Sequence, residues 1–124
     1  MSRINVRNWT SFKVIGLADA NPDGFTVDIL TGEKVTRGFA VGMTHGLSPE
    51  DAATVANLVA LGSWMPSTVY NWTIGGWRDG DKYVIDIGFV ASCSLDCAIE
   101  LGRAYNQDAI FDLTNGKAIT LKGE

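Results

Sequence analysis

Two tryptophans and an aspartate in the second half of the chain are the side chains best placed to hold a ligand. Trp72 and Trp77 flank the pair Gly75-Gly76, and Asp86 follows between two isoleucines. An indole ring can stack on a nucleobase, which is worth about 1–3 kcal/mol per base. Glycines let a ligand approach the backbone closely. The segment therefore predicts a platform for a planar ligand.

Packing in the core or at an interface is the alternative role for each ring. In a regular strand, Trp72 and Trp77 point to opposite faces of the sheet, so at most one of them is expected to line a given pocket. A bulge at Gly75-Gly76 would change that parity. Asp86, on a largely apolar strand, is expected either to be exposed or to have a polar partner.

Arg103 is the cation most suited to an anionic ligand, because a guanidinium can bind a phosphate through two hydrogen bonds and can stack on a purine. Its alternative partner is Glu100, one turn earlier on a predicted helix, in a surface ion pair worth about 0–1 kcal/mol. Arg37 lies beside a glycine at a predicted strand end, where binding groups cluster. Asn106 and Gln107 follow Arg103 closely and are candidates to bond a ribose or a base.

Metal binding and hydrolysis are poorly supported by the residues present. Cys93, Cys97 and the one histidine, His45, are too few for a zinc site. No phosphate-binding loop and no nucleophile motif occurs, so neither a metal nor a cofactor is expected. The two cysteines are expected to be reduced and to pack as small apolar side chains at the start of a helix.

The composition is that of a globular domain. A chain of 124 residues, 46% hydrophobic and 19% charged, is expected to form one domain, 1–124, with its own core. The net charge of −4 argues against DNA or RNA as a partner, because phosphates need a basic surface. The chain has no apolar run long enough to span a membrane, and its start lacks the apolar stretch of a signal peptide. A membrane is therefore not an expected partner.

The apolar pattern predicts the elements that must position these side chains. Alternation and turn residues predict strands at 25–30, 38–43, 69–77, 83–91, 109–113 and 118–121. Ser48 and Ser94 are predicted to cap two helices, the first of them closed by Gly62 and Pro66. Residues 1–20 show no clear periodicity and are expected to form a strand or an ordered arm.

The predicted fold is α+β, with an antiparallel sheet on which two α-helices pack. Two short segments, 28–36 and 112–120, resemble each other in sequence. We interpret them as the same hairpin chemistry used twice rather than as a repeat architecture.

The order and spacing of several motifs resemble those of a family of small phage-encoded proteins. This family is the first type of Thoeris anti-defence proteins, and the resemblance covers about residues 24–121. The motifs that carry it are Gly24–Asp28, Thr31–Glu33, Gly38–Val41, Gly75–Trp77, Tyr83–Ile87 and Asn106–Asp112.

The resemblance implies a protein that binds and sequesters cyclic ADP-ribose isomers without cleaving them, in the cytoplasm of an infected bacterium. It implies pockets between two subunits of a homo-oligomer, with dimers that build a hexamer, and in some members a separate site for cyclic oligonucleotides. In the family an aromatic ring, a hairpin residue and helix arginines contact the ligand. Arg103 matches one of these arginines, and Trp77 and Asp86 are candidates on the hairpin. Gln107 stands where a second arginine is expected, which departs from the family pattern.

The leading hypothesis is therefore phage immune evasion by a protein that is not an enzyme. In it, Trp77 or Trp72 stacks on adenine, Arg103 meets a phosphate, and Asn106 or Gln107 bonds the ribose or base. A second hypothesis is a protein-interaction module that inhibits a host protein directly. A third is a small nucleotide hydrolase that uses His45 with an acid or a thiol.

Overall fold

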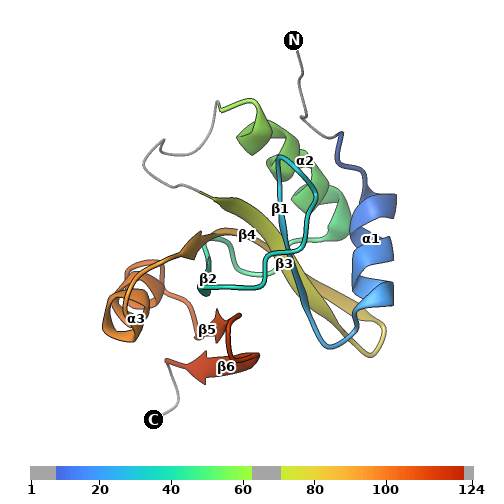
Figure 1. Ribbon diagram of the computed structural model, residues 1–124. Helices are drawn as coiled ribbons and strands as arrows, with labels where there is room; N and C mark the ends of the chain where they lie inside the picture. The colour runs from blue at the N-terminus through green and yellow to red at the C-terminus, as the bar shows by residue number, and fades with distance from the viewer. Residues whose placement is uncertain (1–7, 63–70, 122–124) are drawn as a thin grey trace.

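One antiparallel sheet organises the chain, as Figure 1 shows. The computed structural model describes residues 8–62 and 71–121. In these ranges six strands pair in the order β1-β3-β4-β2-β5-β6. The strands are β1 (Phe25–Asp28), β2 (Phe39–Gly42), β3 (Trp72–Asp79), β4 (Lys82–Ala91), β5 (Ala109–Asp112) and β6 (Lys117–Thr120). The predicted α+β class with an antiparallel sheet is confirmed, although several strands are shorter than predicted. Residues 69–70 of the predicted strand 69–77 lie outside the described residues.

The two predicted helices begin where their capping residues indicated. They are α2 (Pro49–Ala60) and α3 (Leu95–Ala104). The Ser48 hydroxyl accepts the N–H of Asp51 at 3.1 Å, and the Ser94 hydroxyl accepts the N–H of Cys97 at 3.2 Å. Each bond satisfies an N–H that has no partner within its own helix. Gly62 follows α2 with φ +71°, as expected of a helix end, whereas Pro66 lies outside the described residues.

The expectation of a strand or arm in residues 1–20 is wrong for the part that is described. Residues Ser11–Ala20 form a helix, α1, whose N-cap is Thr10. Thr10 Oγ1 accepts the N–H of Lys13 at 3.2 Å. The sequence pattern does not indicate this helix because Val14, Ile15 and Gly16 are weak helix formers. Its stability depends on packing rather than on local propensity.

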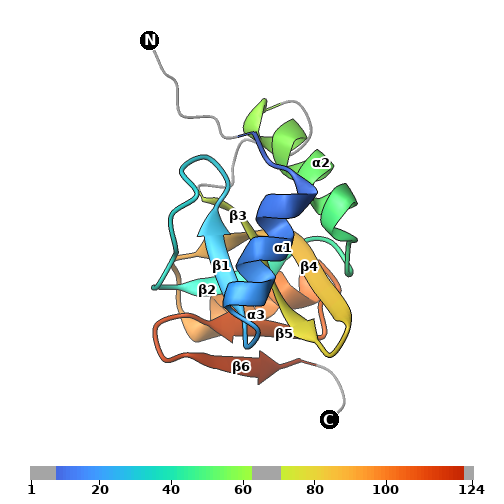
Figure 2. The ribbon, with the colours of Figure 1, turned by 90° about the vertical axis from the view of Figure 1, so that its right-hand side faces the viewer.

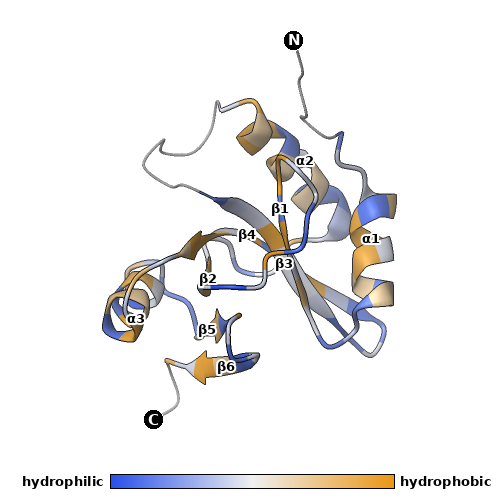
Figure 3. Ribbon diagram, viewed as in Figure 1, coloured by the Kyte–Doolittle hydropathy of each residue, from blue (hydrophilic) through white to orange (hydrophobic). Residues whose placement is uncertain are grey.

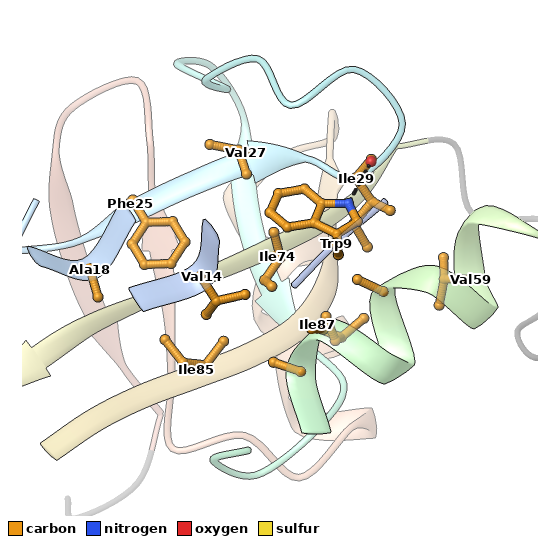
Figure 4. Close-up of a cluster of buried hydrophobic side chains, with 13 residues drawn as sticks. Trp9, Val14, Ala18, Phe25, Val27, Ile29, Val59, Ile74, Ile85 and Ile87 are labelled. Atoms are coloured by element: carbon orange, nitrogen blue, oxygen red, sulfur yellow. Dashed lines mark hydrogen bonds between the residues drawn. The ribbon is translucent and has the colours of Figure 1, made fainter. Parts of the chain in front are cut away.

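Two hydrophobic clusters lie along the sheet. The first joins α1 and α2 to β1, β3 and β4, and Figure 4 shows its side chains. Within it, the indole N–H of Trp9 donates to the carbonyl oxygen of Ile29 at 2.9 Å. The second cluster joins α3 to β2, β4 and β5. Figures 1 and 2 place α1 and α3 on opposite sides of the molecule.

The β3–β4 hairpin pairs without interruption from Trp72 opposite Phe89 to Asp79 opposite Lys82. Because no bulge occurs at Gly75-Gly76, the two tryptophans of β3 point to opposite faces, as the sequence predicted. The turn that closes this hairpin is hydrophilic (Figure 3).

The two similar segments do form the same turn. Asp28 and Asp112 each accept, at the backbone carbonyl, the N–H of the glycine four residues later, at 2.7 and 2.8 Å. Those glycines, Gly32 and Gly116, have φ of +74° and +70°. Each aspartate also accepts backbone N–H bonds at Oδ1. The prediction of one hairpin chemistry used twice is confirmed.

Candidate ligand-binding face

A bulge interrupts the pairing between β4 and the chain that follows β2. The N–H of Met43 donates to the carbonyl oxygen of Ile87 at 2.8 Å, and the N–H of Leu47 donates to that of Ile85 at 2.6 Å. On β4 the two acceptors flank a single residue, whereas residues 44–46 separate the two donors. These extra residues cannot pair as a regular strand, so their polar groups need other partners.

Asp86 is the residue opposite the bulge, and its carboxylate supplies those partners. Oδ1 of Asp86 accepts hydrogen bonds from Thr44 Oγ1 at 2.8 Å and from Gly46 N at 2.6 Å. The Thr44 hydroxyl in turn accepts the N–H of Ile87 at 3.1 Å. Gly46 has φ +73°, a conformation that glycine adopts at little cost. We refer to residues 44–46 together with Asp86 as the Asp86 bulge.

The loop after α3 holds the bulge from its other side. Gln107 is buried, and its Nε2 donates to the carbonyl oxygens of Thr44 at 3.1 Å and Tyr105 at 3.3 Å. His45 Nε2 lies 3.0 Å from the carbonyl oxygen of Asn106 and must donate, because a carbonyl oxygen only accepts. Asn106 follows α3 with φ +57°, which asparagine tolerates better than most residues. The bulge is thus fixed by β4 and by the end of α3.

Burial changes the acidity of this carboxyl group. Asp86 is half-buried, and its loss of hydration raises its pKa above the ordinary value of 3.8. The hydrogen bonds from Gly46 and Thr44 and the nearby charge of His45 lower the pKa by less than burial raises it. Both hydrogen bonds use Oδ1, and none of the described residues bonds to Oδ2. Oδ2 can therefore accept from a ligand hydroxyl or amine.

Trp77 lies on the same face of the sheet as Asp86. The register pairs Trp77 with Val84 and Gly75 with Asp86, and residues two apart on a strand share a face. Diagonal neighbours of this kind are about 7–8 Å apart. The Trp77 side chain is 46% exposed, and Gly75 places only backbone opposite the carboxylate. A flat ligand could therefore lie against the indole and reach Asp86.

The other predicted site residues do not join this face. Trp72 packs against the first core cluster and so serves the core, the alternative role considered for it. Arg103 is in the last turn of α3, where its Nη1 lies 4.0 Å from Glu100 Oε2 and both side chains are largely exposed. Glu100 is the alternative partner that the sequence indicated for Arg103, and the ion pair between them is weak. Arg37 is exposed in the segment between β1 and β2.

Arg37 borders a shallow depression of about 310 Å³ that is lined by residues between 28 and 37. The lining contains no aromatic ring and no residue of the Asp86 bulge. It offers a ligand turn residues and charges but no stacking surface. The face that carries Trp77 and Asp86 is therefore the better candidate site.

The structure also identifies residues that the sequence did not. Thr44 and Gly46 were not predicted, and His45 was considered only as a zinc ligand and for hydrolysis. The signal available was a polar Thr-His-Gly run directly after an apolar strand, where the glycine permits a left-handed backbone.

Within residues 8–62 and 71–121, no group of three or more His, Cys, Asp or Glu side chains is arranged to hold a metal ion. In the same part of the chain, no helix has the length and apolar character needed to cross a membrane.

Comparison of the chain with models of protein families, with curated proteins and with solved structures found no match.

Proposed function

We propose that the protein binds a cyclic nucleotide immune signal, such as a cyclic ADP-ribose isomer, and sequesters it without cleaving it. The observation that carries this proposal is the presence of an exposed indole, Trp77, and a half-buried carboxylate, Asp86, on one face of the sheet. An adenine ring stacks on the indole, and a ribose hydroxyl donates to Oδ2 of Asp86. Gly75 places no side chain opposite Asp86.

Arg103 does not lie on this face of the sheet, and in the proposal it remains the candidate cation for a phosphate of the ligand. Its ion pair with Glu100 is long and solvent-exposed, so the guanidinium gives up that partner at little cost when a phosphate arrives. Asn106 follows on the same loop, and its carbonyl oxygen is tied to the Asp86 bulge through His45. The end of α3 and the bulge are therefore connected by a direct hydrogen bond.

A second subunit completes the site. Sequestration needs the ligand to be enclosed, and the 46% exposed Trp77 shows that a single chain leaves this face open. We therefore propose a homo-oligomer, a dimer or a hexamer, in which a neighbouring copy covers the face. In keeping with the family resemblance, the protein acts for a phage in the cytoplasm of the infected bacterium.

The test is to incubate the full-length protein with a cyclic ADP-ribose isomer, remove unbound ligand, denature the protein by heat and identify what is released. Intact ligand in stoichiometric amount supports sequestration. Degraded ligand would instead favour a hydrolase built on His45 and Asp86, since the residue after His45, Gly46, donates to the Asp86 carboxylate. No retained ligand would remove the proposed function. Trp77→Ala should lose retention, whereas Phe12→Ala, on the exposed surface of α1, should keep it.

A protein-interaction module is the second candidate function. Phe12 on α1 and Leu61 at the end of α2 are 84% and 73% exposed, and large exposed apolar side chains are typical of protein interfaces. Light scattering tests whether the surface that carries Phe12 mediates self-association or is left free for another protein. An oligomer of the 13.3 kDa chain that survives Trp77→Ala but dissociates on Phe12→Ala would assign that surface to self-association. A clean monomer at micromolar concentration would contradict the enclosed site.

A further inference from the structure

The turn between β5 and β6 contains the one asparagine of the sequence that directly precedes a glycine. Asn115 and Gly116 are both exposed, and Gly116 has φ +70°. Asparagine is chemically labile, because the backbone nitrogen of the next residue can attack the carbon of its side-chain amide. Glycine presents that nitrogen with the least hindrance, since it has no side chain. The pair is therefore suited to the loss of the Asn115 amide.

Asp112 holds both groups that would react. The N–H of Gly116 donates to the carbonyl oxygen of Asp112 at 2.8 Å, and Asn115 Nδ2 donates to Oδ2 of Asp112 at 2.7 Å. The backbone N–H of Asn115 donates to Oδ1 of the same carboxylate at 3.1 Å. An N–H in a hydrogen bond loses its proton less readily, and an anchored amide does not rotate freely toward an attacking nitrogen. The closed hairpin therefore protects Asn115, and the reaction requires the turn to open.

The similar turn after β1 shows that the backbone bonds of this turn do not need an amide side chain. Thr31 occupies there the position of Asn115, and its N–H donates to Oδ1 of Asp28 at the same distance, 3.1 Å. The N–H of Gly32 donates to the carbonyl oxygen of Asp28 at 2.7 Å. One turn geometry thus occurs twice, and only the copy between β5 and β6 carries a labile amide.

We propose that Asn115 is a modification site, converted to a carboxylate when the β5–β6 hairpin opens, and that the conversion weakens the hairpin. The Gly116 nitrogen gives its proton to hydroxide and attacks Cγ of Asn115. The new N–C bond closes a cyclic imide, the bond between Cγ and Nδ2 breaks, and the amide leaves as ammonia with a proton from water. A second water molecule then opens the imide to aspartate or isoaspartate. Nothing is oxidised or reduced.

The product no longer fits the turn. In the unmodified protein the Asn115 amide donates to Oδ2 of Asp112, whereas a carboxylate at position 115 has no proton to donate and repels its neighbour. Isoaspartate also adds a carbon to the main chain within the turn. Among the described strands, β6 pairs with β5 alone. Weakening this hairpin therefore releases an edge strand from the sheet.

The first experiment incubates the full-length protein at neutral and mildly alkaline pH and follows the mass of each peptide after digestion. The peptide with Asn115 should gain the mass difference between an amide and a carboxyl group, faster at higher pH. In concentrated guanidinium chloride the gain should be at least about tenfold faster, because unfolding removes the protection. Asn106, which is exposed but precedes Gln107, is the internal control and should stay unmodified over the same time.

Two variants test the protection by Asp112. Asp112→Ala removes the carboxylate that anchors the amide, so folded Asp112→Ala should be modified faster than the folded wild type. Asn115→Thr copies the turn after β1, so it should fold and gain no mass at this position. No mass gain at Asn115 in the denatured wild type would remove the site. Equal rates in the folded and the denatured protein would overturn the protection by the hairpin.

The second experiment measures tryptic cleavage after Lys117 in β6, which requires the hairpin to open. Asn115→Asp represents the aspartate product, and Asn115→Thr lacks the amide without adding a charge. Cleavage of Asn115→Asp should be about fivefold faster than cleavage of Asn115→Thr, because a charge now lies next to Asp112. Equal cleavage rates in the two variants would overturn the weakening of the hairpin.

Discussion

Thr44 and Asp86 are joined by a hydrogen bond of 2.8 Å from the threonine hydroxyl to Oδ1 of the aspartate. The same hydroxyl accepts the backbone N–H of Ile87 at 3.1 Å. The two side chains thus stand in for the backbone bonds that the bulge between β2 and β4 removes. Asp86 contributes to the fold and is proposed to bind a ligand. Substitutions that remove only one of these two roles can distinguish them.

Replacing Asp86 should reveal its structural role. Asp86→Ala leaves the N–H of Gly46 and the hydroxyl of Thr44 without their acceptor, which should lower the free energy of unfolding by about 1–3 kcal/mol. Asp86→Asn keeps an oxygen acceptor and should cost about 1 kcal/mol or less. Urea denaturation measures both. The control is Asp81→Ala in the exposed hairpin turn, and an equal effect there would argue against a structural role of Asp86.

The stability contributed by Asp86 should depend on pH. Its pKa is higher in the folded protein than the ordinary 3.8, so between these two values the folded state binds a proton that the unfolded state has released. The contribution is fully present below pH 3.8 and is lost as pH rises through the raised pKa. The free energy of unfolding of the wild type relative to Asp86→Asn should therefore fall over this window, as urea denaturation at several acidic pH values would show.

The stability that Asp112 contributes should depend on pH in the opposite direction. The side chain of Asn115 hydrogen-bonds to its carboxylate and holds its pKa below 3.8. Its contribution is present above pH 3.8 and is lost as pH falls through the lowered pKa. Relative to Asp112→Asn, the wild type should lose stability on acidification. Parallel trends for the two variants would contradict the assignment of at least one of these pKa shifts.

The two tryptophans of β3 should separate binding from stability. Trp77→Ala should reduce ligand affinity by about 1–3 kcal/mol, the value of one stacked base, and should change the free energy of unfolding little. Trp72→Ala removes a partly buried ring that packs against the first core cluster and should cost about 1–3 kcal/mol of stability. Calorimetric titration and urea denaturation of each variant give the two quantities. Unchanged affinity in folded Trp77→Ala would move the ligand away from this face.

Two glycine substitutions should have opposite effects. A Cβ at Gly42 would lie 2.6 Å from Oε1 of Gln107, whose amide nitrogen is anchored to Thr44, so Gly42→Ala should cost about 1–3 kcal/mol. A Cβ at Gly16, in the middle of α1, would have no atom within 4 Å, and Gly16→Ala should stabilise the protein by about 0.5–1 kcal/mol. Thermal unfolding of the two variants compares them directly. A neutral Gly42→Ala would show that Gln107 can move freely.

Arg103 should matter for a ligand and not for the fold. Its exposed ion pair with Glu100 predicts that Arg103→Ala changes the free energy of unfolding by about 0–1 kcal/mol. If the guanidinium binds a phosphate, affinity should fall by about 1.5–3 kcal/mol, as for other charge-assisted hydrogen bonds. Calorimetric titration measures the affinity. Lys117→Ala on β6 removes the same charge elsewhere and should leave it unchanged.

Most of the fold could be predicted from the sequence because local signals and tertiary packing agree there. Ser48 and Ser94 cap their helices as the sequence indicates, and the alternation at Ile85, Asp86 and Ile87 matches the burial in the first half of β4. The helix Ser11–Ala20 could not be predicted, because only the packing of Val14 and Ala18 against the first cluster, and not their sequence context, makes it favourable.

The candidate site was predicted in part. The opposite orientation of Trp72 and Trp77 follows from strand geometry alone. The expectation that Asp86 is either exposed or has a polar partner follows from the cost of burying a charge. The identity of that partner could not be predicted. It depends on which residues between Met43 and Leu47 are left out of the pairing with β4, and the sequence pattern does not indicate this.

Strand β4 takes part in both hydrophobic clusters, and this affects how the protein partially unfolds. Its first half gives Ile85 and Ile87 to the cluster under α1 and α2, and its second half gives Phe89 and Ala91 to the cluster under α3. The segment from α3 to the end of β6 can therefore detach as a cooperative unit while the first cluster stays closed. In deuterated water, the amide protons of β5 and β6 should exchange through that partial opening. Those at Ile85 and Ile87 should exchange only when the whole chain unfolds.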